Sequence, residues 1–112
     1  MTKSKILLIY TGGTIGMIKE ANQPYLKPFN FENILDNVKE IKLLNCHIDT
    51  ISIKNPIDSS NICINNWIEL VEIIKTNYNS FDGFVILHGT DTMSYTASAL
   101  SFLIQNLSKP II

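Results

Sequence analysis

Three short segments of the sequence combine small residues with hydroxyl and carboxylate side chains, which act in enzyme sites as nucleophiles, proton carriers and anions. They are residues 11–16 (Thr-Gly-Gly-Thr-Ile-Gly), 57–60 (Ile-Asp-Ser-Ser) and 88–92 (His-Gly-Thr-Asp-Thr). Each segment follows a stretch with the hydrophobic pattern of a β-strand. Because the carboxyl ends of parallel strands open into the same crevice, we expect the three segments to line one polar pocket.

The glycine-rich segment 11–16 does not have the spacing of a phosphate-binding loop. It matches neither G-x-G-x-x-G nor G-x-x-x-x-G-K-[ST], and no lysine follows the glycines at the required place, so nucleotide binding is disfavoured. Gly12 and Gly13 would instead let the backbone adopt positive φ angles and approach a ligand, which would present the Thr14 hydroxyl to the crevice. A plain tight turn with Thr14 as a capping residue is the simpler alternative.

The other two segments also have simpler interpretations. Asp91 or Thr92 could cap a helix that begins at Met93, and residues 58–60 could form an ordinary Asx turn. His88 could act as a base, but no Ser or Cys nucleophile pairs with it by sequence, so a structural role at a strand end is favoured. Each alternative explains one segment, and none explains why all three follow predicted strands.

The elements that must hold these segments alternate between strand and helix patterns. Apolar runs and alternation predict strands at residues 5–10, 47–53 and 84–87, and residues 110–112 open a further one. Helical spacing predicts helices over residues 30–41, from a cap at Asn65 or Asn66 to Tyr78, and over residues 92–107. This order predicts the α/β class, a parallel-sheet sandwich with helices on both faces.

The length of 112 residues allows one domain, residues 1–112. Hydrophobic residues make up 46% and charged residues 17% of the chain, which excludes a disordered tail. The last predicted strand opens at Pro110 and has no room to finish. We therefore expect the domain to be incomplete, the front part of a longer protein.

Charge and cysteine usage exclude several partners. The net charge is −1 and all 9 basic residues are Lys, so the arginine contacts typical of nucleic-acid binding are absent. Cys46 and Cys63 form no C-x-x-C pair and have no clustered His, which predicts free thiols in a reducing compartment and no zinc site. The apolar run at residues 6–10 is too short to span a membrane. We therefore expect a cytoplasmic protein with neither a membrane nor a nucleic-acid partner.

Two motifs in this order resemble the paired signature of bacterial L-asparaginases. They are residues 10–16 (Tyr-Thr-Gly-Gly-Thr-Ile-Gly) and 82–93 (Asp-Gly-Phe-Val-Ile-Leu-His-Gly-Thr-Asp-Thr-Met). Residues 58–60, and the run 95–102 (Tyr-Thr-Ala-Ser-Ala-Leu-Ser-Phe), resemble the type I cytoplasmic branch in particular. The resemblance covers the whole chain, and it implies the amino-terminal portion of a much longer protein that has a second α/β domain and forms homodimers or homotetramers.

The resemblance implies an amidohydrolase that converts L-asparagine and water to L-aspartate and ammonia, without a cofactor or a metal. Thr14 matches the family's nucleophile, and Tyr25 matches the mobile-loop tyrosine that assists it. Thr90 and Asp91 match two catalytic members of a Thr-Lys-Asp cluster. The positions implied to contact the substrate are Asp58, Ser59, Ser60, Thr90 and Asp91. Branches of the family differ at the position of Ser60.

The sequence departs from the family in what it lacks. The family's catalytic Lys and an acidic residue of the second domain both lie beyond the equivalent of Ile112, so activity is expected only in the full-length form. Two alternatives stay open. One is the asparaginase-like subunit of a tRNA-dependent amidotransferase, which the near-neutral charge disfavours, and the other is a non-catalytic remnant that keeps an amino-acid-binding pocket.

Overall fold

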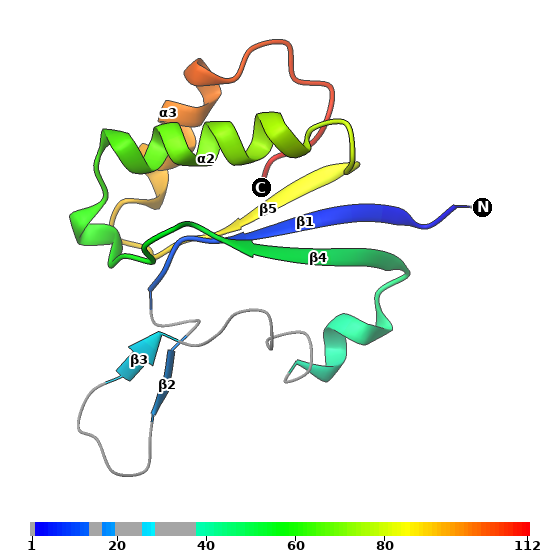
Figure 1. The fold of residues 1–112 in the computed structure, drawn as a ribbon, viewed down its shortest axis with the longest axis horizontal. Helices are drawn as coiled ribbons and strands as arrows, with labels where there is room; N and C mark the ends of the chain where they lie inside the picture. The colour runs from blue at the N-terminus through cyan, green and yellow to red at the C-terminus, as the bar shows by residue number, and fades with distance from the viewer. Residues whose placement is uncertain (1, 14–16, 20–25, 29–37) are drawn as a thin grey trace.

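A three-stranded parallel sheet forms the centre of the protein, whose computed structural model describes residues 2–13, 17–19, 26–28 and 38–112 (Figure 1). The strand order is β4-β1-β5, with β1 at Ser4–Tyr10, β4 at Cys46–Ser52 and β5 at Gly83–Leu87. All three predicted strands are confirmed, and both pairings of β1 are parallel. Two short strands, β2 (Met17–Lys19) and β3 (Leu26–Pro28), pair with each other in an antiparallel ribbon.

The segment at residues 110–112 extends the sheet beyond β5, as its apolar pattern predicts. Ile111 forms a parallel bridge with Phe84. The Phe84 N–H donates to the Pro110 carbonyl over 2.9 Å, and the Ile112 N–H donates to the Phe84 carbonyl over 3.0 Å. These bonds occupy the outer edge of β5, so the sheet has the order β4-β1-β5 followed by this fourth segment.

Helix α2 (Ile64–Asn77) begins one residue before the predicted cap. Cys63 is the N-cap residue, so the expectation that Asn65 or Asn66 caps the helix is wrong. The reason is that Asn66 acts from inside the first turn, where its side-chain oxygen accepts a hydrogen bond of 2.9 Å from the Cys63 N–H. Asn66 therefore stabilises the helix start by reaching back to it.

Helix α3 (Met93–Leu103) is shorter than predicted, since the apolar spacing suggested a helix that continues to Leu107. The backbone is already extended at Ile104, and Asn106 has a positive φ of 56°. Asn tolerates this left-handed conformation better than most residues, and a helix cannot pass through it. The chain turns there toward the sheet edge at Ile111.

The helix expected over residues 30–41 lies largely outside the described residues. At Val38 the backbone is extended, with φ −105° and ψ 91°, and a 3-10 helix, η3 (Lys39–Leu43), follows it. A single helix that continues through Ile41 is therefore wrong, because the extended residue interrupts it. In Figure 1, η3 lies on the opposite side of the sheet from α2 and α3.

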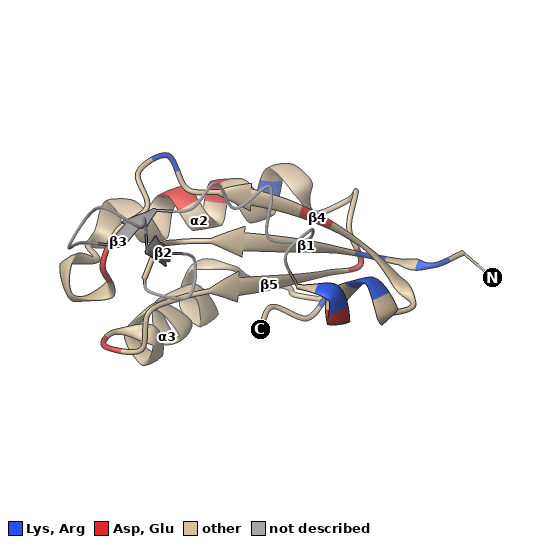
Figure 2. Ribbon diagram, turned by 90° about the horizontal axis from the view of Figure 1, so that it is seen from below, with Lys and Arg blue, Asp and Glu red and all other residues tan. Residues whose placement is uncertain are grey.

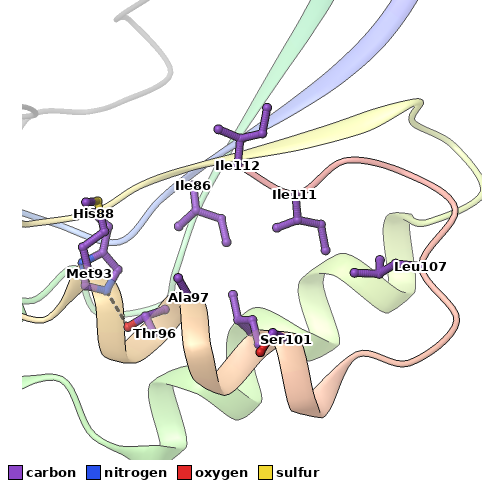
Figure 3. A pocket seen from close by; sticks show the side chains of 10 residues that line it. Ile86, His88, Met93, Thr96, Ala97, Ser101, Leu107, Ile111 and Ile112 are labelled. Carbon is purple, nitrogen blue, oxygen red and sulfur yellow. Dashed lines mark hydrogen bonds between the residues drawn. The ribbon is translucent and has the colours of Figure 1, made fainter.

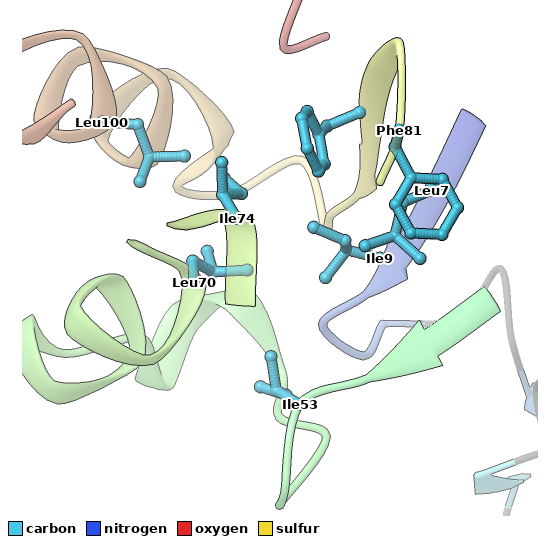
Figure 4. Close-up of a cluster of buried hydrophobic side chains, with 8 residues drawn as sticks. Leu7, Ile9, Ile53, Leu70, Ile74, Phe81 and Leu100 are labelled. Carbon is cyan, nitrogen blue, oxygen red and sulfur yellow. The ribbon is translucent and has the colours of Figure 1, made fainter. Parts of the chain in front are cut away.

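The core lies between the sheet and the two α-helices, which pack side by side on one face (Figures 1 and 2). Side chains alternate along β1, so Leu7 and Ile9 point to the helices while Leu8 and Tyr10 point to the other face. All four are buried, which confirms that the central strand is covered on both faces. The helix-side cluster contains Leu7, Ile9, Ile53, Leu70, Ile74, Phe81, Phe84 and Leu100 (Figure 4).

The described surface carries charges of both signs, spread over several elements (Figure 2). Both cysteines are free thiols. In the described part of the chain, no helix is both long and apolar enough to cross a membrane.

Leu70→Ala should destabilise the protein strongly, because Leu70 has no exposed surface in the helix-side cluster. We expect the free energy of unfolding to fall by about 2–5 kcal/mol, the usual cost of such a cavity. Glu72→Ala is the control on the same helix, since the Glu72 carboxylate is exposed and lies 3.9 Å from the Lys75 ammonium. That change should cost less than about 0.5 kcal/mol in urea denaturation. Equal losses for the two variants would contradict the assignment of the core.

Candidate active site

The segments after β1, β4 and β5 meet at one end of the sheet, as the order of elements predicts (Figure 1). Backbone hydrogen bonds continue past the strand ends. The Ile57 N–H donates to the Thr11 carbonyl over 2.9 Å, and the Thr11 N–H donates to the Leu87 carbonyl over 3.1 Å. The Thr11 hydroxyl donates to the same Leu87 carbonyl over 2.9 Å. Thr11 therefore ties the first segment to both of its neighbours.

Gly12 and Gly13 adopt the positive φ angles that their sequence context predicts, 122° and 86°. A Cβ on Gly12 would lie 2.2 Å from the Ile57 carbonyl oxygen, so no side chain fits there. A Cβ on Gly13 would lie 3.4 Å from the Cα of Gly89. The first segment thus touches the second at Gly12 and lies close to the third at Gly13.

The second and third segments are also in contact with each other. A Cβ on Gly89 would lie 2.6 Å from the Ser59 hydroxyl oxygen, and the Ser59 side chain is buried. The Thr92 hydroxyl donates to the Ser59 carbonyl over 2.7 Å. Thr92 is the N-cap residue of α3, but its hydroxyl makes no capping bond to the helix. It connects two loops instead, a role that the helix-cap interpretation did not anticipate.

Asp58 forms the Asx turn that was the simpler interpretation of its segment. Its Oδ1 accepts hydrogen bonds of 2.9 Å from both the N–H and the hydroxyl of Ser60, at the start of the short 3-10 helix η4 (Ser59–Asn61). The backbone hydrogen bond and then the hydroxyl of Ser60 lower the pKa of the Asp58 carboxyl below its ordinary value. The exposed carboxylate is therefore ionised at neutral pH, and a local turn does not prevent it from attracting a cationic group.

His88 is held by a chain of hydrogen bonds that reaches into both helices. Its Nδ1 lies 2.6 Å from the Gly89 carbonyl oxygen, which can only accept, so Nδ1 carries the proton. Nε2 then accepts from the Thr96 hydroxyl over 2.8 Å, and the Trp67 indole N–H donates to that hydroxyl oxygen over 2.9 Å. His88 thus orients the third segment, in agreement with the structural role that its position suggests.

The parts played by Trp67 and Thr96 were not predicted from the sequence. A signal was available, because a partly buried indole N–H usually finds an acceptor and Thr96 is a buried hydroxyl on the next helix. The pairing itself joins residues 29 positions apart and has no local pattern.

A cavity of about 200 Å³ lies beside this network, between β5, α3 and the segment at Ile111 (Figure 3). Its lining is mostly hydrophobic, and His88 and Thr96 are at one end. An amino acid with two charged groups does not suit such a lining. The polar edge where the three segments meet is therefore the better candidate site.

The predicted site residues divide into two groups. Thr14 and Tyr25 lie outside the described residues, so their roles stay predictions. The others lie in the second and third segments, where Ser59 is buried and the rest are exposed; these are Asp58, Ser59, Ser60, Thr90 and Asp91. In the described residues, no group of three or more His, Cys, Asp or Glu side chains is arranged to hold a metal ion.

Gly12→Ala should destabilise the protein, because the new Cβ collides with backbone atoms of Ile57 and Gly12 has a φ that other residues avoid. We expect a loss of about 2–5 kcal/mol in the free energy of unfolding, from overpacking and backbone strain together. Gly83→Ala is the control, since its Cβ would meet side-chain atoms of Pro110 at 3.1 Å and Ile6 at 3.3 Å that can shift. Urea denaturation should give a smaller loss for this control, and the reverse ranking would contradict the rigid contact.

Comparison with known proteins gives a consistent result. The family model "Asparaginase, N-terminal" matches residues 5–112. L-asparaginase 1 of Escherichia coli (strain K12) is 45% identical over 114 residues, which covers 100% of this chain and 33% of that protein. The crystal structure of L-asparaginase I from Vibrio cholerae superposes with a TM-score of 0.84 at 39% identity, over 98% of this chain and 32% of that one.

A second group of relatives bears a different name. One subunit of the glutamyl-tRNA(Gln) amidotransferase of Metallosphaera sedula is 38% identical over 112 residues, which covers 96% of this chain and 25% of that protein. The chain thus spans a third or less of the length of each of these relatives.

Proposed function

This chain belongs to the asparaginase family, and we propose that it supplies the threonine-bearing part of an active site that hydrolyses L-asparagine to L-aspartate and ammonia. One observation carries the proposal. Gly13 is a neighbour of Gly89, close enough that a Cβ on Gly13 would contact the Gly89 backbone, and in the sequence each of these glycines directly precedes a proposed catalytic threonine, Thr14 and Thr90. Two threonines that follow neighbouring glycines suit a mechanism in which both act on one substrate.

Thr14 is the proposed nucleophile. Its hydroxyl oxygen attacks the side-chain amide carbon of asparagine, and a neighbouring group must take its proton because a hydroxyl is a weak nucleophile at neutral pH. Tyr25 is proposed to assist this transfer. Backbone N–H groups of the glycine-opened segments would stabilise the oxyanion that forms. Ammonia leaves, and water then hydrolyses the ester on Thr14 to release aspartate.

The substrate contacts are proposed for the second and third segments. The ionised carboxylate of Asp58 suits the α-ammonium group of the substrate, and the hydroxyl of Ser59 suits its carboxylate. The Ser60 hydroxyl donates to Asp58 and would have to turn away from it to contact the substrate. Thr90 and Asp91 would act with a Lys that lies outside these 112 residues. In the proposed route the Thr14 hydroxyl is the nucleophile in place of a metal-activated water, so the route uses neither a metal nor a cofactor.

This chain covers a third or less of the length of its relatives. We propose that catalysis needs a longer, full-length protein with a second domain, which assembles as a homodimer or homotetramer. The free thiols of Cys46 and Cys63 support a reducing, cytoplasmic location.

The identity to one component of an amidotransferase favours a second candidate function, in which the same threonines release ammonia for a tRNA-bound acceptor. The two candidates differ in the assay. An asparaginase releases ammonia from free asparagine without any partner, whereas an amidotransferase component requires its partner protein and tRNA. A non-catalytic remnant would bind asparagine and release no ammonia in either assay.

Thr14→Ala in the full-length protein should abolish ammonia release from asparagine, because it removes the proposed acyl acceptor. Loss of a nucleophile costs about 10⁴-fold or more in kcat. The melting temperature should change little, because the sequence predicts a loop at this position. Thr76→Ala, at an exposed position of α2, is the control and should leave kcat unchanged. Turnover by Thr14→Ala within about tenfold of the parent protein would exclude the nucleophile role.

Residues 1–112 expressed alone should release no ammonia from asparagine, because Thr90 and Asp91 would lack the proposed Lys partner. Hydrophobic side chains on the outer faces of α2 and α3, such as Ile64 and Phe102, would promote aggregation. Ammonia release, size-exclusion chromatography and binding of a hydrophobic dye measure these outcomes. Turnover close to that of the full-length protein would contradict the proposed division of the active site.

A further inference from the structure

Tyr10 is a buried polar residue with no role in the chemistry described so far. It is the last residue of β1 and has no exposed surface, and its side chain lies on the face opposite α2 and α3. There it packs with Leu8, Val85 and Leu87. A hydrophobic cluster of this kind needs only the aromatic ring. The buried phenol hydroxyl adds a requirement, because it must find a hydrogen-bond partner.

The Tyr10 hydroxyl donates to the Gly13 carbonyl oxygen over 3.0 Å. The two positive φ angles at Gly12 and Gly13 turn the chain back over the end of β1, which brings this carbonyl within reach. Burial raises the pKa of the Tyr10 phenol above its ordinary value. The hydroxyl therefore keeps its proton at neutral pH and remains a donor.

Other contacts hold the residues just before this carbonyl. Thr11 is fixed by hydrogen bonds to Leu87 and Ile57, and Gly12 packs against the Ile57 backbone. The Gly13 carbonyl belongs to the planar peptide group that links Gly13 to Thr14. Holding its oxygen fixes the orientation of that peptide plane.

We infer that Tyr10 is a positioning residue, whose hydroxyl orients the Gly13 peptide group to which the proposed nucleophile Thr14 is bonded. This inference rests on the proposed function of Thr14. The positioning role explains why a hydroxyl is present on the buried ring, which packing alone does not explain. The contact acts from the face of the sheet opposite the helices, and it is separate from the His88 network that holds the third segment.

Tyr10→Phe in the full-length protein tests the inference, because it removes the hydroxyl and keeps the ring. We expect kcat for asparagine to fall about 10- to 100-fold, the effect of a small misplacement of a reacting group. KM should change far less, since the proposed substrate contacts lie in the second and third segments. A role in stability alone would lower the melting temperature and leave kcat of the folded enzyme unchanged.

Tyr78→Phe is the matched control. The Tyr78 hydroxyl also bonds to the protein, accepting from the Ser108 N–H over 2.9 Å, but on a segment that follows α3. This variant should keep the parent kcat. Two further replacements at position 10 keep the size of tyrosine. With p-aminophenylalanine, which restores a donor, kcat should recover. With p-methylphenylalanine, which has no donor, kcat should stay low. This pair tests the donor even if Tyr10→Phe does not fold.

The outcomes separate this inference from the proposed function. Suppose that Thr14→Ala is inactive while the variants without a donor at position 10, Tyr10→Phe and p-methylphenylalanine, keep kcat within about twofold of the parent. That change is far smaller than the effect of a misplaced group, so the positioning role is wrong and the nucleophile role stands. If Thr14→Ala is fully active, the proposed function fails first. Equal kcat for the p-amino and p-methyl variants would also overturn the role of the donor.

Discussion

Close packing at two glycines along the carboxyl edge of the sheet is the constraint on which the rest of the structure depends. Gly12 leaves no room for a side chain against Ile57, and Gly89 leaves none against Ser59. Protein interiors are close-packed, and no side chain separates these loops at the two glycines. The loops therefore fit together in one relative arrangement. The backbone of these loops therefore holds their short polar side chains at fixed positions.

The strand order makes this arrangement possible, and anchors on both faces of the sheet maintain it. β1 lies between β4 and β5, so its final residues border both neighbouring loops. From the helix side, Trp67 and Thr96 hold His88, which bonds to Gly89. On the other face Tyr10 bonds to Gly13. Gly13 and Gly89 are thus each held by a hydrogen bond from a different face of the sheet.

The sequence predicted what depends on local pattern. Continuous apolar residues indicated the buried strands, and paired glycines indicated positive φ angles at Gly12 and Gly13. Helix ends were less predictable, because they depend on single residues: Asn66 stabilises α2 from inside its first turn, and Asn106 accompanies the early end of α3. The bond from Thr92 to Ser59 could not be predicted, since it joins segments 33 residues apart through a side chain that equally suits a helix cap.

A site built in this way separates the groups that hold the fold from those that would do chemistry. A side chain at Gly12 would collide with the Ile57 backbone, and one at Gly89 would collide with the buried Ser59 side chain, so these positions admit little change without loss of stability. The exposed side chains of Asp58, Thr90 and Asp91 are less constrained. Among the described residues, the Asp58 carboxylate bonds within its own turn, and Thr90 and Asp91 lie at the surface. Under the proposed function, changes there would affect substrate binding at small cost in folding free energy. Proteins named as an asparaginase and as a subunit of an amidotransferase are both similar to at least 96% of this chain.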